Sequence, residues 1–182
     1  GYGGSCFPKD TRALVGTAQR FGSPIRIVET VVDINDKRKR QMAEKVIEAC
    51  GGSVAGKTIA VLGLTFKPNT DDMRDAPSLV IVPHLQAKGA RIRAYDPEGT
   101  HEALKILKIE TCDNAYEPLK DADGVVILTE WNEFRALDLQ KVKSLLKKPL
   151  MVDLRNIYRA NQMAAAGFTY VSVGRGTAYP EA

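Results

Sequence analysis

The sequence predicts an α/β protein: a long N-terminal connecting helix followed by a Rossmann-like three-layer domain built on a parallel sheet. Several apolar runs of strand length lack polar alternation, which is typical of strands buried on both faces. Helical stretches separate these runs, and this alternation favours a parallel sheet covered by helices on both sides. With 182 residues, the chain can bury a sizeable core. The predicted strands are 58–64, 90–96, 124–130, 150–154 and 168–173, and the helices between them are 76–88, 101–107, 116–121, 137–147 and 161–166.

Two helices are predicted ahead of the sheet. The first spans 11–21 and is ended by Gly22. Ser23 offers an N-cap and Pro24 a first helical position, so a second helix should span 24–50. Its length of about 38 Å is long for one small core, so a connecting or subunit-interface helix is favoured over a core helix.

These elements divide the chain into two parts. We expect residues 1–54 to form a loop and the long helix, and residues 55–182 to form the Rossmann-like domain. The apolar stripe of the long helix is interrupted in its middle by Asn35, Asp36 and the basic run 37–40. On a helix these four basic side chains point in different directions, and no aromatic residue lies among them. A solvated helix surface is therefore favoured over a nucleic-acid interface.

Composition and charge exclude further classes of protein. The chain is 44% hydrophobic with a formal net charge of +4, which is ordinary for a globular protein and suits an anionic ligand. No run is apolar and long enough to span a bilayer and no signal peptide begins the chain, so we expect a cytoplasmic protein without a membrane partner. The distant Cys6, Cys50 and Cys112 favour reduced thiols, and the isolated His84 and His101 predict no metal site.

Parallel sheets bind ligands at the carboxyl ends of their strands. The loop after the first strand, "GLTFKPNTDDMRDAP", lacks the GxGxxG sequence of a dinucleotide fold but contains Lys67 and Arg74. Two cations there could hold a diphosphate. Alternatively, Lys67 is a solvated loop residue and Arg74 pairs with Asp71, Asp72 or Asp75.

Three other charged residues of these loops have competing interpretations. Asp75 is predicted to be the N-cap of the next helix rather than a ligand. Asp96, which precedes a proline, is predicted to form a turn, although an acid at a strand end is also typical of a ribose ligand. Arg155 follows a buried strand, and either a carboxylate or a ligand phosphate could hold it.

The opening stretch "GYGGSCFPKD" is the most informative part of the sequence. Its glycines permit close approach of the backbone to a ligand. Cys6 lies near a predicted helix N-terminus with Lys9 close by, and both features favour the reactive thiolate. Asp10 is either an N-cap or a general base for water attacking an acyl group on the enzyme. From these residues alone, Cys6 is either a packed thiol or a nucleophile.

Several separated segments resemble one family of enzymes. "GYGGSCFPKDTRAL" resembles the catalytic-cysteine segment of the UDP-glucose/GDP-mannose dehydrogenase family. "GLTFKPNTDDMRDAP", "YDP", "TEW" and "DLRN" resemble the C-terminal domain of that family, in the same order. Because several segments match in register over nearly the whole chain, the resemblance is far more specific than any one of them.

The resemblance implies an NAD-dependent enzyme that oxidises the C6 alcohol of a nucleotide sugar to a carboxylate. Cys6 would form a thiohemiacetal and then a thioester with the substrate, and Asp10 would help to activate the hydrolytic water. Within the family, Ser5 and Phe7 beside the cysteine resemble the UDP-glucose branch. The resemblance implies a substrate site of Tyr2, Gly3, Phe66, Lys67 and Arg155, and a cofactor site of Cys6, Phe7, Pro8, Lys9 and Arg74.

The same resemblance bears on assembly. It implies that the helix 24–50 is a dimerisation helix, and that the family's N-terminal NAD-binding domain is absent from these residues, so that the chain should not catalyse alone. Two alternatives stay open: a dehydrogenase for GDP-mannose or UDP-N-acetylmannosamine, and a non-catalytic module that binds sugar nucleotides or dimerises.

Overall fold

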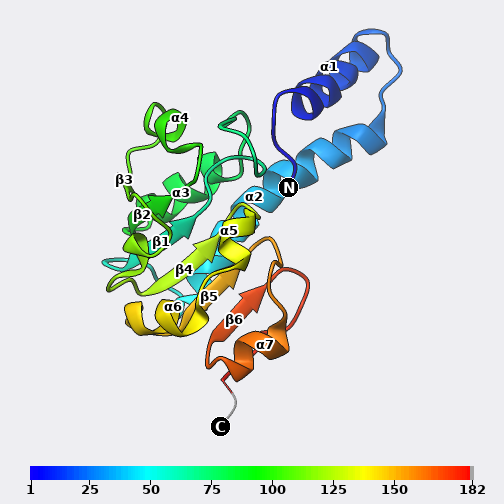
Figure 1. Ribbon diagram of the computed structural model, residues 1–182. Coiled ribbons are helices and arrows are strands. Elements are labelled where there is room, and N and C mark those ends of the chain that lie inside the picture. Colours follow the sequence, from blue (N-terminus) through cyan, green and yellow to red (C-terminus); the bar gives the residue numbers. More distant parts are fainter. Residues whose placement is uncertain (181–182) are drawn as a thin grey trace.

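The computed structural model, which describes residues 1–180, confirms the predicted α/β architecture (Figure 1). Six strands form one sheet in the order β3-β2-β1-β4-β5-β6, and every neighbouring pair is parallel. This is the doubly wound order, which reverses direction between β1 and β4. The strands are β1 (Thr58–Leu62), β2 (Arg91–Tyr95), β3 (Glu110–Thr111), β4 (Gly124–Ile127), β5 (Leu150–Asp153) and β6 (Thr169–Ser172).

Helices cover both faces of the sheet, as the sequence predicts. One hydrophobic core joins the sheet to the second half of α2 (Arg26–Ala49), to α3 (Ser78–Ala87) and to α4 (Thr100–Leu104). The other core lies under the 3-10 turn η1 (Glu117–Leu119), α5 (Asn132–Arg135), α6 (Leu139–Leu145) and α7 (Ala160–Ala165). Strands β1, β4 and β5 are buried almost throughout, because side chains from both cores pack against them.

The two N-terminal helices form, but with different starting points. Helix α1 spans Cys6–Arg20 and begins five residues before its predicted start, which places Pro8 in its first turn, where a proline is tolerated. Helix α2 begins two residues late, after Ile25, and no side chain caps it. The prediction of Ser23 as its N-cap is therefore wrong.

Local differences elsewhere involve short elements. The predicted helix 116–121 is a single 3-10 turn, and both β3 and α5 escaped prediction because elements of two to four residues give too short a pattern to recognise. The helix after β1 begins at Ser78 after Pro77, so the prediction of Asp75 as its N-cap is also wrong. In the part of the chain that the structure describes, no helix has the length and hydropathy needed to cross a bilayer.

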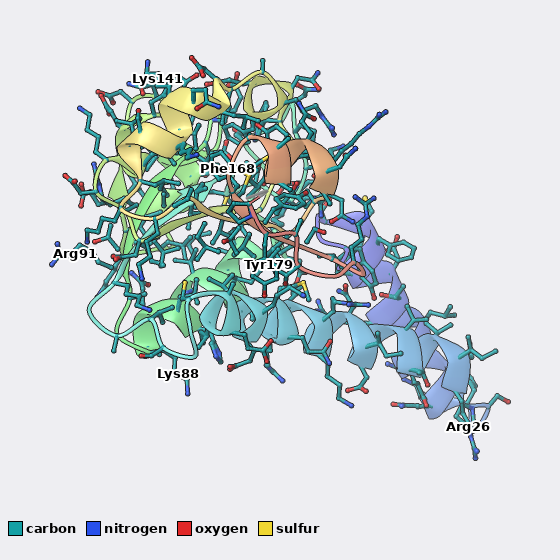
Figure 2. All side chains as sticks on the ribbon, turned by 90° about the horizontal axis from the view of Figure 1, so that it is seen from below. Arg26, Lys88, Arg91, Lys141, Phe168 and Tyr179 are labelled. Atoms are coloured by element: carbon teal, nitrogen blue, oxygen red, sulfur yellow. The ribbon has the colours of Figure 1, made fainter. Side chains whose placement is uncertain are left out.

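Helix α1 and the first half of α2 project from the sheet domain as a helical hairpin (Figure 1). In Figure 2, α2 runs along the lower edge of the domain and continues well beyond it to Arg26 at its far end. Its 24 residues correspond to about 36 Å. The first half buries almost no apolar side chain, whereas Met42, Ala43, Val46 and Ile47 of the second half enter the domain core.

Candidate functional site

The carboxyl ends of β1 and β4 meet at the point where the strand order reverses, which is where doubly wound sheets bind ligands. There the end of β1 packs tightly on the loop after β4. Gly63 has φ of +89°, and a Cβ atom on it would lie 2.5 Å from the Cβ of Thr129. The Thr129 hydroxyl donates a hydrogen bond to the Thr65 carbonyl at 2.6 Å. The space between the ends of β1 and β4 is therefore occupied by the protein's own residues, Gly63, Thr65 and Thr129.

Asp96, at the end of β2, satisfies the backbone amides of this turn. It is 2% exposed, and its Oδ2 accepts hydrogen bonds from the amides of Leu64 (2.6 Å) and Thr65 (3.1 Å). Trp131 Nε1 donates to the same oxygen at 3.2 Å. Amides at the end of the first strand face the pyrophosphate in dinucleotide folds, so this internal carboxylate stands where a ligand anion would bind.

Asp96 also forms the turn that the sequence predicts. Its Oδ1 accepts hydrogen bonds from the amides of Glu98 and Gly99, at 3.1 and 2.6 Å. Both carboxylate oxygens are thus occupied within the protein, and the alternative of a ribose ligand has no support. A diphosphate at this edge must be held by other groups.

Phe66 and Lys67 follow Thr65 in the loop after β1. Lys67 is exposed, and its Nζ lies 5.3 Å from the centroid of the Phe66 ring. The opening loop also packs on Phe66: a Cβ on Gly4 would lie 2.8 Å from Phe66 Cε2, and one on Gly3 would lie 3.1 Å from Phe66 Cβ. The structure therefore brings the predicted residues Gly3, Phe66 and Lys67 into one neighbourhood.

Arg74 pairs with Asp72. Its Nε and Nη2 donate to the two Asp72 oxygens at 2.9 and 2.8 Å, and these hydrogen bonds lower the pKa of Asp72. The arginine side chain remains mostly exposed, so its other N–H groups face solvent. A cavity of about 420 Å³ beside Arg74 is also lined by Asp71, Asp72 and Glu102. Those carboxylates disfavour a diphosphate inside that cavity.

The opening loop is bound to the loop after β1. The Gly4 amide donates to the Arg74 carbonyl at 2.8 Å. A Cβ on Gly3 would lie 2.5 Å from the Asp75 carbonyl oxygen, so the two backbones touch. Tyr2 is held from the other side by Asn35, whose side-chain amide bonds both its N–H and its C=O.

Cys6 is the first residue of α1 and is exposed, with the Ser5 hydroxyl 3.6 Å from its sulfur. Asp10 lies one turn further along and is exposed, 3.4 Å from Lys9. Because Asp10 is the fifth helical residue, its interpretation as an N-cap is wrong.

Phe7 and Pro8, the two residues that follow Cys6, differ in their exposure to solvent. Phe7 is exposed and stacks edge-on against the Tyr2 ring, with the ring centroids 4.6 Å apart. Pro8 is buried in the first turn of α1. The cysteine stretch therefore presents Cys6, Phe7 and Lys9 to solvent.

Arg155 follows β5 and is half-buried, and its Nε donates to Glu130 after β4. Burial acts to raise the pKa of Glu130, but the hydrogen bond and charge of Arg155 outweigh it and the pKa lies below its usual value. A carboxylate holds this arginine, which was one of its two predicted partners.

The Arg155 loop is shaped by the buried Asp153. Its Oδ1 accepts from the Arg155 amide at 2.9 Å, and its Oδ2 accepts from the Ile157 amide at 2.8 Å and the Tyr170 hydroxyl at 2.7 Å. Burial and this hydrogen bond raise the pKa of Tyr170. The "D" of "DLRN" is thus a structural residue that orients the arginine two positions later.

Sequence reasoning missed three residues at this junction: Asn35, Lys39 and Glu130. Asn35 and Lys39 were assigned to a break in the apolar stripe and to a solvated basic run, yet both are buried. Their spacing of four residues, continued at Ala43, follows the buried face of α2, and this spacing is the signal that could have found them. Glu130 belongs to the segment "TEW" that resembles the family, but nothing in that segment indicated its ion pair with Arg155.

Two family models match the chain. Residues 60–160 match the UDP binding domain of the UDP-glucose/GDP-mannose dehydrogenase family, and residues 1–37 match the central domain of the same family. The first match covers strands β1 to β5 and the loops at their carboxyl ends, but not β6, and the second covers the cysteine loop, α1 and the first half of α2.

Curated relatives resemble almost the whole chain. It is 58% identical to the UDP-glucose 6-dehydrogenase of Rhizobium meliloti, over 96% of this chain and 40% of the relative. It is 46% identical to the UDP-glucose 6-dehydrogenase TuaD of Bacillus subtilis, over 96% of this chain and 38% of the relative. The chain thus spans about 40% of the length of the curated relatives it matches.

Solved structures agree with these relatives. A UDP-glucose dehydrogenase from Pyrobaculum islandicum aligns over 98% of this chain and 38% of its own, with a TM-score of 0.79 and 30% identity. A UDP-D-ManNAc dehydrogenase from Pyrococcus horikoshii aligns over 97% of this chain and 39% of its own, with a TM-score of 0.81 and 27% identity. The arrangement of the cysteine loop, long helix and sheet is therefore shared with experimentally determined dehydrogenases.

Proposed function

Because the chain belongs to the UDP-glucose/GDP-mannose dehydrogenase family, we propose that it forms the C-terminal part of an NAD-dependent UDP-glucose 6-dehydrogenase. One observation carries the proposal: an exposed cysteine begins a helix directly after a loop that is hydrogen-bonded to the ligand edge of a sheet matching the family's UDP binding domain. A nucleophile beside a nucleotide site is what covalent oxidation of a sugar nucleotide requires. The 58% identity to a relative of this name supports the choice of substrate.

In this proposal, Lys67 and Arg155 hold the diphosphate of UDP-glucose, and Phe66 with the backbone of Tyr2 and Gly3 lies against the rest of the substrate. The Leu64 and Thr65 amides already donate to Asp96 and are not free for a phosphate. Cationic side chains must therefore bind the diphosphate in their place, which supports this assignment. Arg155 can release its bond to Glu130 when a phosphate approaches, or hold both groups at once.

The cofactor of this reaction is NAD, which supplies the hydride acceptor for both oxidations when it is bound. The exposed surface around Cys6 fits an anionic dinucleotide: Phe7 offers an open aromatic ring, and Lys9 and Arg74 offer exposed cations. Pro8 shapes this surface through its backbone in the first helical turn. These residues, with Cys6, form the proposed cofactor face.

Cys6 performs the covalent chemistry. Its thiolate attacks the C6 aldehyde carbon that the first oxidation produces, and the resulting thiohemiacetal becomes a thioester in the second oxidation. Water then attacks the thioester carbon, and the thiol leaves as the carboxylate product forms. Asp10, one helical turn from Cys6, accepts the proton of that water.

Three further properties belong to this proposal. Residues 1–54 supply the cysteine and a homodimer interface along the helix 24–50, and residues 55–182 supply the UDP-binding domain. The exposed apolar side chains on the first half of α2 support the dimer. We place the protein in the cytoplasm, where unpaired thiols stay reduced.

The test replaces Cys6 by Ser in the longer dehydrogenase that contains this chain. We expect the steady-state rate of UDP-glucuronate formation to fall at least about a thousandfold, because oxygen is a far weaker nucleophile than a thiolate. Cys50→Ser is the matched control, since Cys50 follows the C-terminal end of α2, away from the opening loop. This variant should retain the wild-type rate.

Activity that survives Cys6→Ser would favour a non-catalytic module that binds UDP sugars. Comparison of UDP-glucose with GDP-mannose and UDP-N-acetylmannosamine as substrates of the wild-type enzyme separates the branches of the family. A higher kcat/KM for either of the other two would overturn the choice of UDP-glucose.

A further inference from the structure

Two polar residues of α2 are buried where the opening loop and the loop after β1 meet. Asn35 is 5% exposed and Lys39 is 4% exposed, and they lie one helical turn apart on the same face. Burying an amide or a cation is costly unless its hydrogen bonds are satisfied, so the partners of these two side chains indicate what they are for.

Asn35 bonds the backbone of the opening loop twice. Its Oδ1 accepts the Tyr2 N–H at 2.7 Å, and its Nδ2 donates to the Tyr2 carbonyl at 3.1 Å. Only a side-chain amide offers an acceptor and a donor side by side, so no other residue of similar size can make both bonds. The position and orientation of Tyr2 are thereby fixed on α2.

Lys39 fixes the neighbouring loop. Its Nζ donates to the Asp75 carbonyl at 3.3 Å and lies 4.0 Å from the Asp75 carboxylate. Asp75 adopts φ of +50°, a conformation that residues other than glycine rarely hold without support. Arg12 of α1 reaches the same carboxylate, with Nη1 3.2 Å from Oδ2.

These contacts bracket Cys6 along the chain. Before it, Tyr2 is bound to Asn35, and Gly4 donates to the Arg74 carbonyl. After it, Arg12 is bound to Asp75, which Lys39 holds. The first turn of α1, with Cys6 at its start, therefore has little freedom to move relative to the sheet edge.

We infer that Asn35 and Lys39 are positioning residues that hold the Cys6 thiol at the distance and angle from the UDP site that attack on the substrate requires. The inference rests on the proposed role of Cys6 as nucleophile. Neither residue touches the reacting atoms in this scheme. A shift of the nucleophile by about 1 Å lowers a rate by up to about a hundredfold, so small displacements here are sufficient to matter.

The experiment uses the longer dehydrogenase with three variants. Asn35→Asp keeps the size of the side chain but places a carboxylate against the Tyr2 carbonyl, and Lys39→Met removes the donor from Asp75 while keeping the length. Lys39→Arg restores a charged donor. Lys37→Met, on the exposed face of the same helix, is the matched control.

The readout is kcat per UDP site, with the sites counted by calorimetry so that unfolded enzyme does not enter the rate. We expect Asn35→Asp and Lys39→Met to lower this kcat by about 10- to 100-fold with less than about a threefold change in the UDP dissociation constant. Lys39→Arg should recover most of the rate, and Lys37→Met should equal wild type. The rate constant for alkylation of Cys6 by iodoacetamide, followed by peptide mapping, should change in the two damaging variants as well.

Normal kcat per site in both Asn35→Asp and Lys39→Met overturns the inference, and the proposed function stands if Cys6→Ser is still inactive. If Cys6→Ser is active, both fall together. If Asn35→Asp binds no UDP at all, the inference is tested by comparing Lys39→Met with Lys39→Arg. Equal values of kcat per UDP site in these two variants would contradict a positioning role.

Discussion

Lys67 differs from the two arginines of the ligand edge in its ion pairing. Arg74 is bound to Asp72 and Arg155 to Glu130, whereas Lys67 forms no ion pair with any of residues 1–180. An unpaired, exposed ammonium is attracted to an incoming phosphate without first breaking a bond. Lys67 is therefore the residue whose removal should most directly weaken UDP binding.

Lys67→Ala should raise the dissociation constant of UDP about tenfold, because one charge-assisted hydrogen bond is lost. Isothermal titration calorimetry at low salt measures the change. Lys88→Ala, at the opposite end of α3, is the control and should bind as wild type does. An unchanged constant for Lys67→Ala would return this residue to the solvated-loop interpretation.

The Glu130–Arg155 pair couples the ligand edge to pH. The pKa of Glu130 is lowered in the folded state, since Arg155 outweighs the effect of burial. The unfolded chain therefore binds its proton more readily, and the stabilisation is present above the unfolded pKa and is lost as pH falls through the folded one. The affected window lies below about pH 5, around the ordinary glutamate value.

Glu130→Gln should weaken the dependence of stability on pH in that window. Wild-type unfolding free energy, from urea titrations at pH 5 and pH 3, should fall more between the two values than that of the variant, by on the order of 1 kcal/mol or less for a partly exposed pair. Glu48→Gln, at an exposed site without an ion pair in the described chain, should not reduce the fall. Parallel behaviour of Glu130→Gln and wild type would contradict the coupling.

At the scale of the element, the end of β1 and the interior of α1 make opposite demands on glycine. Gly63 has positive φ and meets Thr129, so the strand can turn into the ligand loop only without a Cβ. Gly16 lies inside α1 with open space around it, where a Cβ would meet nothing within 4 Å. The first glycine shapes the site, and the second only weakens a helix.

Gly63→Ala should lower the unfolding free energy by at least about 2 kcal/mol, through backbone strain and the clash with Thr129. Gly16→Ala should raise it by about 0.5–1 kcal/mol, since alanine restricts the unfolded chain and suits a helix. Urea titration of both variants against wild type gives the two values. A Gly63→Ala protein as stable as wild type would show that the β1 turn can relax.

At the scale of the whole molecule, the projecting hairpin of α1 and the first half of α2 exposes apolar side chains, which supports the proposed dimer. Phe21, Ile27 and Ile34 are exposed on it, Ile27 to 80% and Ile34 to 54%. A protruding helix pair with apolar side chains in water is typical of an oligomer interface. The second half of α2 is buried in the domain core. A partner bound to the first half of the same helix would therefore be fixed rigidly relative to the site.

The double variant Ile27→Asp/Ile34→Asp should dissociate the proposed dimer, because two carboxylates would be buried in an apolar interface. Sedimentation equilibrium should give the mass of one chain for the variant and of two for wild type. Ile106→Asp, which alters an apolar side chain of similar exposure outside the hairpin, should stay dimeric. Wild-type mass in the double variant would place the interface elsewhere.

Much of the architecture follows from local pattern. The strands from β1 to β6 other than β3, and the order of helices between them, were predicted because continuous apolar runs and helical spacing are properties of neighbouring residues. Helix ends were less predictable: the cap at Ser23 and the N-caps at Asp10 and Asp75 failed because other contacts set these backbones. The residues proposed for the site came from the resemblance of whole segments to a family.

The sequence by itself determined the layered α/β fold and the cations after the first strand, and it left open whether Cys6 is packed or exposed. Only the tertiary structure decided that Asp96 binds the amides of the turn after β1, that Glu130 holds Arg155, that Asn35 holds the opening loop and that Lys39 holds the loop after β1. The physical reason is that each of these contacts joins residues 25 or more positions apart. Which buried charge finds which partner depends on the packing of the whole chain, and no local pattern encodes it.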